Sequence, residues 1–304
     1  MDYERINDNE QYIEIKNVKN FNLKQTFECG QCFRFKQTEE NTFILVALNR
    51  VIELKKENNS ILLYNTTKKE VEDIWIKYFD LEREYSKIKD ELSKDELIRK
   101  SMEFGDGIRI LNQDPFEMLI SFIISARNSI PSIKKTIGKI SARYGKEIEY
   151  KGEVYHVFPK LEEIKDATID EIRECGASFR SKYIVDTIKN LYMSKLEIEL
   201  ENSEYREFNL DYIANLNDDD CHKALQKFKG VGAKVADCIM LFSMGKSSAF
   251  PVDVWVKRAM IHFYGAEDAS LNKIRIFGRN KFGDLAGFAQ QYLFYYAREN
   301  KINV

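Results

Sequence analysis

The spacing of apolar residues predicts short β-strands in the first part of the chain. Residues 12–18 alternate between apolar and polar side chains, as expected of a strand with one buried face. Residues 43–48, 51–54 and 61–64 are short apolar runs, and Asn58-Asn59 offers a turn before the last of them. These segments predict a small antiparallel sheet that ends near residue 66.

From about residue 67 the predicted structure is helical throughout. Asp114 followed by Pro115 is a typical helix start, because the carboxylate caps the first turn and proline already has a helical φ. Thr168 and Glu171 have the spacing of a capping box. Further helices are expected to begin at Pro131 and Phe179 and to cover 218–228, 233–244, 253–264 and 284–299. The acidic stretch 197–207 is expected to be a solvated face or a linker.

Composition narrows the classes of partner. With 304 residues, 44% of them hydrophobic, the chain can bury real cores, and its net charge of −2 does not indicate nucleic acid. Any contact with nucleic acid must therefore come from a local basic patch. One candidate is the segment 127–146, which contains no acidic residue; the alternative is a solvated helix. Its basic residues are Arg127, Lys134, Lys135, Lys139, Arg143 and Lys146.

Several classes of protein are not expected. No uncharged apolar run approaches the ~20 residues of a membrane helix, and the first residues do not resemble a signal peptide. The five cysteines are scattered, and only Cys29 and Cys32 have the spacing of metal ligands, without a second pair. We therefore expect a cytoplasmic protein with no membrane partner, no bound metal and no other cofactor.

The segment 225–239 predicts two helices joined by a tight hairpin. Gly230 and Gly232 allow positive φ and a close approach of the backbone to a partner, and Val231 is expected to pack between the helices. Ala236 is small enough to let the helices come together. The hairpin amides and the N-terminus of the second helix would form an anion site that fits a DNA phosphate. The alternative is an ordinary glycine-containing turn.

Two residues near this hairpin suggest chemistry at a sugar carbon. Lys234 is expected one turn into the second helix, beside the hairpin, and Asp253 is expected to cap a later one. A lysine with the ordinary pKa of ~10.4 is almost fully protonated at pH 7. Burial and a helix N-terminus would lower the pKa of Lys234 and favour an amine that can form a Schiff base. The alternatives are a solvated phosphate contact for Lys234 and a plain helix cap for Asp253.

These segments resemble the 8-oxoguanine DNA glycosylase branch of the helix-hairpin-helix glycosylases. Gly-Val-Gly-Ala-Lys-Val-Ala-Asp-Cys at 230–238 and Pro-Val-Asp-Val at 251–254 are similar to the family's active-site signature. Gly-Gln-Cys-Phe-Arg at 30–34 is similar to its lesion-contacting loop, 112–123 to the helix before its intercalating loop, and 287–294 to its last helix.

The resemblance implies an α+β fold that is mainly α, in three parts. Residues 1–105 would form a TATA-binding-protein-like antiparallel β domain. Residues 106–220 would form a helical subdomain with the DNA-intercalating loop. Residues 221–304 would form the catalytic helix-hairpin-helix segment and the C-terminal helix.

The resemblance also implies a monomeric, bifunctional enzyme. It would excise 8-oxoguanine from double-stranded DNA with Lys234 as nucleophile and Asp253 as its acidic partner, and then nick the strand. The Gly30 carbonyl would accept the N7–H of the lesion, and Gln290 would bind its Watson–Crick edge. Phe294 and Cys238 would sandwich the base. DNA contacts are implied for Arg127, Asn128, Gly230, Gly232, Val235 and Trp255.

The chain departs from the family pattern at three places. Arg127-Asn128-Ser129 stands in place of an Asn-rich run, and Pro131-Ser132 stands where an arginine is expected to read the orphaned cytosine. Trp255 replaces a histidine. We expect a relaxed choice of the base opposite the lesion and one altered phosphate contact.

Two other functions stay open from the sequence. One is a glycosylase for alkylated or mismatched bases, and the other is a non-catalytic DNA-binding protein that uses the hairpin as a clamp. Lys234 argues against a purely monofunctional glycosylase, and the absence of a four-cysteine cluster argues against the iron–sulfur branches of the family.

Overall fold

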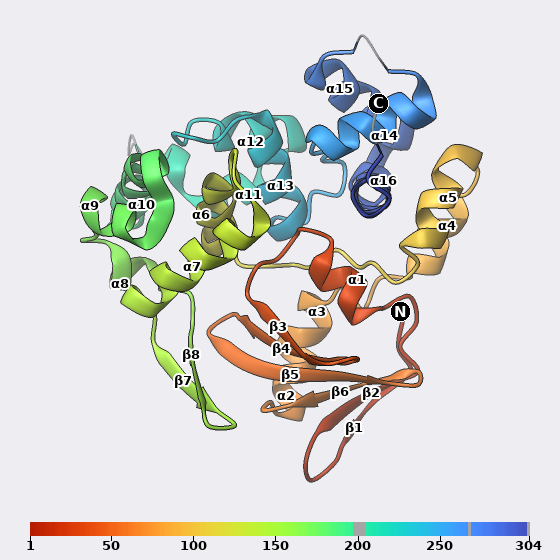
Figure 1. Ribbon diagram of the computed structural model, residues 1–304, viewed down its shortest axis with the longest axis horizontal. Helices are drawn as coiled ribbons and strands as arrows, with labels where there is room; N and C mark the ends of the chain where they lie inside the picture. The colour runs from red at the N-terminus through yellow and green to blue at the C-terminus, as the bar shows by residue number, and fades with distance from the viewer. Residues whose placement is uncertain (197–204, 267–268, 303–304) are drawn as a thin grey trace. The chain divides into compact units, whose positions relative to one another are not determined.

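A computed structural model of the chain describes residues 1–196, 205–266 and 269–302 (Figure 1). Most of the acidic stretch 197–207, namely 197–204, lies outside the described residues. The chain forms two compact units. The first comprises residues 1–45, 52–112 and 245–304, and the second comprises 46–51 and 113–244.

An antiparallel sheet of six strands forms the β part, in the order β1-β2-β6-β5-β4-β3. The predicted segments correspond to β2, β4, β5 and β6, and the turn at Asn58-Asn59 joins β5 to β6, so these predictions are confirmed. The two strands that the pattern missed, β1 and β3, lie at the edges of the sheet. Edge strands bury little, and their sequences RIND and FKQTE show no apolar alternation. The strands are β1 (Arg5–Asp8), β2 (Ile13–Lys16), β3 (Phe35–Glu39), β4 (Thr42–Ala47), β5 (Arg50–Glu57) and β6 (Ser60–Tyr64).

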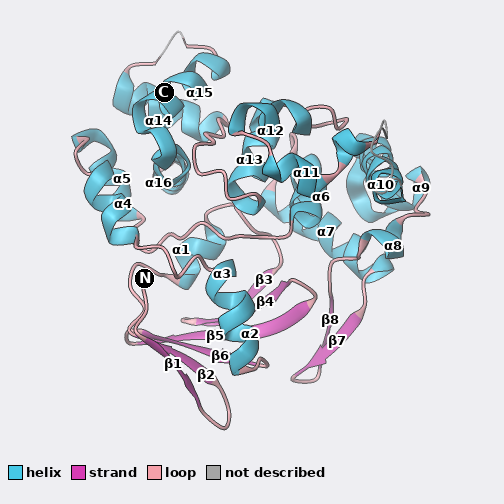
Figure 2. Ribbon diagram, turned by 180° about the vertical axis from the view of Figure 1, so that it is seen from behind, coloured by secondary structure: helices cyan, strands magenta, loops and turns pink. Residues whose placement is uncertain are grey.

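Helices complete the first unit. Figure 1 shows α2 and α3 behind the sheet and Figure 2 shows them in front of it, so this helical segment covers one face. Between α2 and α3 the π-helical turn Val71–Trp75 places the Trp75 ring in the core, where it is fully buried. The helices of this unit are α1 (Leu23–Glu28), α2 (Lys68–Glu70), α3 (Ile76–Tyr78), α4 (Tyr85–Leu92), α5 (Glu96–Phe104), α14 (Val254–Tyr264), α15 (Leu271–Phe282) and α16 (Ala286–Glu299).

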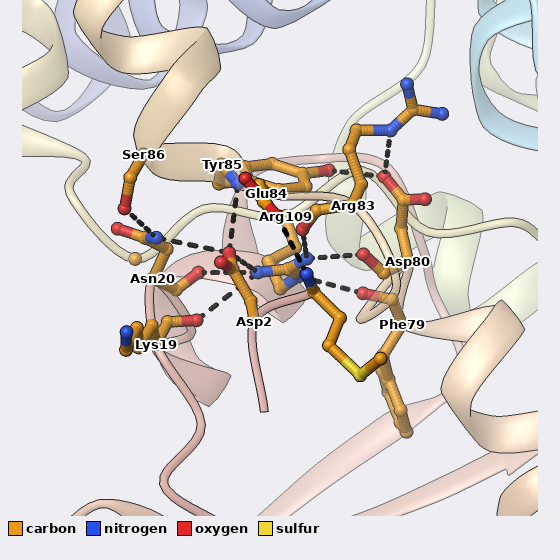
Figure 3. Close-up of polar contacts among 12 residues, drawn as sticks. Asp2, Lys19, Asn20, Phe79, Asp80, Arg83, Glu84, Tyr85, Ser86 and Arg109 are labelled. Carbon is orange, nitrogen blue, oxygen red and sulfur yellow. Dashed lines mark hydrogen bonds and ion pairs between the residues drawn. The ribbon is translucent and has the colours of Figure 1, made fainter. Parts of the chain in front are cut away.

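Arg109 is a buried polar centre of the first unit (Figure 3). Its Nη1 donates to the carboxylate of Asp2 at 2.8 Å, and its guanidinium lies 3.9 Å from the centre of the Tyr85 ring. The same carboxylate accepts the Tyr85 amide at 3.0 Å. Both charges are buried, and such a pair is retained only when its hydrogen bonds are satisfied. The remaining donors of Arg109 reach the carbonyls of Lys19, Asn20, Phe79, Asp80 and Arg83.

The second unit is mostly helical, and its predicted caps are confirmed. Asp114 accepts the Glu117 amide at 2.8 Å at the start of α6, and Thr168 and Glu171 form a reciprocal capping box at α9. The helices are α6 (Pro115–Ser125), α7 (Ile130–Tyr144), α8 (Leu161–Ile164), α9 (Ile169–Ile172), α10 (Ser181–Leu196), α11 (Leu210–Asn215), α12 (Asp218–Leu225) and α13 (Ala233–Ser243).

One segment of this unit contradicts the expectation of helix throughout. Strands β7 (Glu147–Tyr150) and β8 (Glu153–His156) form an antiparallel hairpin. Its turn, Lys151-Gly152, has φ values of 52° and 76°, which twist the strands correctly for a two-residue hairpin. The alternation Glu-Ile-Glu-Tyr before this turn was the signal for a strand.

No helix in the described ranges of either unit has the length and apolar character required to cross a membrane.

Candidate active site

The predicted hairpin lies between α12 and α13 in the second unit. Gly230 has a φ of 86°, as expected, and a Cβ at this position would lie 2.8 Å from the Tyr183 ring. Val231 is buried, and its amide donates to the Phe228 carbonyl at 3.1 Å. Lys229 forms an ion pair with Asp186 on α10 at 2.6 Å. Glycine is therefore required at position 230 by both backbone conformation and space.

Gly232 serves a different purpose from the one expected. Its φ is −99° with an extended ψ, so the prediction of positive φ is wrong here. It is the N-cap of α13, has no side chain to bind the first-turn amides, and a Cβ on it would meet no atom within 4 Å among the described residues. First-turn amides have no carbonyl within their own helix. The backbone is therefore accessible to an anion.

Two side chains that pack beside the hairpin, His222 and Asp237, were not identified from the sequence. His222 on α12 makes a 3.1 Å hydrogen bond through Nε2 to the Ala233 carbonyl and lies 3.6 Å from the buried carboxylate of Asp237. Its Nδ1 is 3.1 Å from the amide nitrogen of Gln226. These contacts connect the first turn of α13 to the preceding helix. No local pattern marks them, because they depend on the packing of α12 against α13.

Lys234 lies in the first turn of α13 and is half-buried. Its Nζ is 5.1 Å from the centre of the Phe122 ring, which in turn stacks on Phe242 at 5.7 Å. Cys238 is one turn further along α13 and is buried, as is the side chain of Val235. The buried side chain of Val235 is therefore not available to a ligand, whereas its first-turn amide has no carbonyl partner within its own helix.

Asp253 belongs to the first unit and caps α14, as expected. One carboxylate oxygen, Oδ1, accepts the amides of Trp255 and Val256, each at 2.9 Å. Trp255 is half-buried, and the Arg258 guanidinium lies 4.8 Å from the centre of its indole ring. The two amides fix the orientation of the carboxylate.

The Gly30 loop follows α1 and is held by buried glutamines. Gln291 on α16 donates to the Cys29 carbonyl at 3.3 Å, and Gln31 donates to the Arg109 carbonyl at 2.7 Å. Burial raises the pKa of Cys29 to about 12, so this residue is a neutral thiol. Cys32 is also buried. The spacing of the two cysteines therefore reflects the packing of this loop.

Gly30 faces the last helix of the chain. Its φ is 79°, and a Cβ on it would lie 3.1 Å from the Phe294 ring of α16. Gln290, four residues before Phe294, is only 3% exposed, so it is not a surface residue. Its Oε1 is buried and has no hydrogen-bond partner within the described part of the chain. A buried acceptor without a partner fits a site that is completed by a ligand. In the first unit Gly30 therefore packs against Phe294, and Gln290 lies one turn before Phe294 on the same helix.

The loop after α6 contains Arg127 and Asn128. Arg127 is exposed and has a φ of 52°, whereas Asn128 is half-buried and donates through Nδ2 to the Ile124 carbonyl at 3.2 Å. The buried Arg180, which was missed in the sequence, donates to the carbonyls of Ala126 and Arg127 at 2.9 and 3.0 Å. Its neighbour Phe179 is 51% exposed. The loop thus presents Arg127 from a fixed backbone.

The predicted basic face is smaller than expected. Arg143 pairs with Glu171 and Glu174 at 2.9 and 2.8 Å, and Lys146 lies 3.7 Å from Glu163. These acids come from α8, α9 and the turn after α9, so an acid-free stretch of sequence is not an acid-free surface. Arg127, Lys135 and Lys139 are the exposed residues for which no such ion pair is seen in the described structure.

Comparison with protein families places this chain among DNA-repair enzymes. Residues 14–119 match the model of the 8-oxoguanine DNA glycosylase N-terminal domain. Residues 120–280 match the model of HhH-GPD superfamily base excision DNA repair proteins. A protein of Methanothermobacter thermautotrophicus, named "Probable N-glycosylase/DNA lyase", is 30% identical over 255 residues, which are 77% of this chain and 76% of that protein.

Solved structures agree with this placement. The 8-oxoguanine glycosylase/lyase of Clostridium acetobutylicum, solved with DNA containing cytosine opposite 8-oxoguanine, is 52% identical with a TM-score of 0.94. The similarity covers 99% of this chain and all of that one (100%). A 3-methyladenine DNA glycosylase from Archaeoglobus fulgidus is more distant, at 26% identity, a TM-score of 0.69 and coverage of 86% and 88%.

Proposed function

The chain belongs to the HhH-GPD superfamily of base excision DNA repair proteins, and we propose that it excises 8-oxoguanine from double-stranded DNA and then cleaves the strand. The single observation that carries this proposal is Lys234 in the first turn of α13, directly after the glycine hairpin. A phosphate bound at the hairpin brings a nucleotide close to the lysine. The amine is the group that distinguishes a lyase from a simple hydrolase.

Lys234 supplies the covalent chemistry. Its neutral amine attacks C1′ of the damaged nucleotide, the bond from C1′ to the base nitrogen breaks, and the base leaves with the bonding electrons and a proton. The nitrogen gives up a proton, its lone pair forms the C1′=N bond as the C1′–O4′ bond breaks, and O4′ takes up a proton, which leaves a protonated Schiff base. That group acidifies the C2′ proton, whose removal expels the 3′ phosphate and nicks the strand.

Asp253 stabilises the positive charge that develops on the sugar. Its carboxylate is oriented by the two amides of α14 that it accepts. A negative charge held in a fixed position lowers the barrier without reorganising during the step. Its roles as helix cap and as electrostatic partner are therefore compatible.

The base is recognised by the group around Gly30. The Gly30 carbonyl accepts N7–H, which is a donor in 8-oxoguanine and is absent in guanine. The buried, unpartnered Oε1 of Gln290 accepts a hydrogen bond from the Watson–Crick edge of the base. Phe294 and Cys238 cover the two faces of the flipped ring.

DNA is bound through its backbone and its vacated stack. The amides of the hairpin, including those of Gly232 and Val235, bind phosphate. Trp255 lies close in sequence to Asp253 and contacts the sugar-phosphate backbone. Arg127 rather than Asn128 fills the space left by the flipped base, because its side chain is exposed and Asn128 is tied to α6. The protein acts as a monomer in the cytoplasm, where its five buried cysteines stay reduced thiols.

Borohydride trapping tests the proposal directly. Purified protein is incubated with duplexes that contain 8-oxoguanine, an alkylated base, uracil or no lesion, each with sodium borohydride. We expect a covalent adduct only with 8-oxoguanine, because reduction fixes the Schiff base. An adduct only with an alkylated base would mean that alkylated bases, and not 8-oxoguanine, are the substrate. Binding without any adduct or excision would mean that the protein is a non-catalytic DNA-binding clamp.

A further inference from the structure

Arg298 contacts both Phe294 and the backbone just before Gly30, two elements of the proposed base-binding site. It lies four residues after Phe294 on α16, so the two side chains share a helix face. Its guanidinium carbon is 5.2 Å from the centre of the Phe294 ring. Its Nη2 donates to the Glu28 carbonyl at 2.5 Å, two residues before Gly30. One side chain therefore holds both the stacking ring and the backbone that leads into the Gly30 loop.

The third guanidinium nitrogen of Arg298 makes no stabilising hydrogen bond among the described residues. Nη1 of Arg298 is buried and has no hydrogen-bond partner among the residues that the structure describes. It is 3.7 Å from the position that a Cβ on Gly30 would occupy. A buried donor without a partner is costly, and an apolar side chain of similar length would avoid that cost. Packing alone therefore does not explain an arginine at this position.

We propose that Arg298 is a positioning residue for the damaged base. The proposal rests on the proposed function, in which the Gly30 carbonyl and the Phe294 ring contact the flipped base. The guanidinium covers one side of Phe294 through a cation–π contact and so restricts the tilt of the ring. The hydrogen bond to the Glu28 carbonyl also fixes the distance between the Gly30 loop and α16. The spacing between carbonyl and ring is thus set by Arg298.

This role makes a selective prediction about the two activities. Gly30 and Phe294 act on the base, and an abasic site has no base. Arg298 is therefore needed for excision but not for cleavage of a strand that already carries an abasic site. A side chain that only stabilises the fold would affect both activities together.

The test compares Arg298→Met and Arg298→Lys with the wild type. Single-turnover rates are measured on an 8-oxoguanine duplex and on a duplex with a preformed abasic site, together with thermal unfolding. We expect Arg298→Met to lower excision about ten- to hundredfold and abasic cleavage less than about twofold. Arg298→Lys should restore part of the excision, because it keeps a cation and a donor. Lys100→Met is the matched control, because it removes a cation from another aromatic ring of α16, with the Lys100 Nζ 5.7 Å from the centre of the Tyr296 ring.

Three outcomes would overturn the proposal in distinguishable ways. Equal losses in both activities, with a lower melting temperature, would make Arg298 a structural residue. Unchanged excision in Arg298→Met would remove any role at the site. A wild-type protein that cleaves abasic DNA but leaves 8-oxoguanine intact would refute the proposed substrate itself, and the role of Arg298 with it.

Discussion

The hairpin region, Gln226 to Lys234, and the Gly30 region, formed by the Gly30 loop and α16, hold polar groups in opposite ways. In the hairpin region the backbone is exposed at Gly232, and no side chain caps the helix that follows. In the Gly30 region the glutamines and Arg298 are largely buried, and two of their polar atoms have no partner in the described structure. The first arrangement suits a charged, solvated ligand, and the second suits a ligand that displaces water.

This difference separates two tasks of one enzyme. Phosphate and sugar are the same at every nucleotide, so the hairpin region can serve any site on DNA. A base differs from its neighbours only at its edges, and a buried donor or acceptor without a partner penalises the wrong edge. We therefore expect changes in the hairpin region to affect both activities, and changes in the Gly30 region to affect excision alone.

The largest expected effect comes from Lys234→Gln. Without the amine no Schiff base can form, so the borohydride adduct, base excision and cleavage of abasic DNA should all fall by at least about a thousandfold. Binding to a lesion duplex should remain. Lys223→Gln is a matched control, because Lys223 is an exposed lysine of α12. An adduct that persists in Lys234→Gln would mean that another amine is the nucleophile.

Gly30→Ala should cause the next largest loss of excision and should leave the cleavage of abasic DNA unchanged. Alanine at a φ of 79° is strained by ~1–2 kcal/mol, and its Cβ would press on Phe294 at 3.1 Å. Single-turnover excision should therefore fall about ten- to hundredfold. Gly152→Ala has a similar φ of 76° but lies in the turn between β7 and β8, so it is the control for positive-φ strain away from the Gly30 region and should leave excision unchanged. An equal loss of excision in Gly152→Ala would show that such strain acts through general destabilisation and not at Gly30.

Sequence patterns predicted the parts of the molecule whose reasons are local. The capping residues Asp114, Thr168 and Asp253 were found because a cap acts within one helical turn. Positive φ was predicted correctly for Gly230 but not for Gly232, because a glycine in the sequence does not show whether it is needed for its φ or for the space in front of it.

The parts that were missed depend on contacts between distant segments. Arg180 reaches the loop after α6 across more than fifty residues of chain, and Arg298 reaches Glu28 from the other end of the first unit. The pairing of Arg143 with the acids of α9 and the following turn was hidden for the same reason. Charge along a sequence predicts a surface only when no other element packs beside it.

The segment expected to read the base opposite the lesion lies outside both regions, and we expect only a weak preference for that base. Pro131-Ser132 stand where the resemblance to the family leads us to expect an arginine that reads the orphaned cytosine, and one bidentate base contact is worth ~1–3 kcal/mol. Excision rates opposite adenine should be within about ten- to hundredfold of those opposite cytosine. Single-turnover rates on four duplexes that differ only in this base measure the ratio. A ten-thousandfold preference for cytosine, on the order of 5.5 kcal/mol, would show that another residue supplies the contact.

The smallest expected effect concerns how Gln290 and Gly30 divide recognition between them. Guanine and 8-oxoguanine share the Watson–Crick edge that Gln290 binds and differ at N7 and C8. Gln290→Ala should therefore weaken excision about tenfold, through loss of a buried hydrogen bond worth ~1–1.5 kcal/mol, while normal guanine remains uncleaved.

The Gly30 carbonyl alone can supply about a hundredfold preference for the lesion, because an unsatisfied acceptor costs ~1–3 kcal/mol. Normal guanine exceeds the lesion in DNA by far more than this, so earlier steps of base flipping must also select. Removing Gln290 leaves these steps and the Gly30 contact intact. Long incubations of Gln290→Ala with undamaged duplexes provide the measurement, and excision of normal guanine there would assign discrimination to Gln290 and contradict this division of tasks.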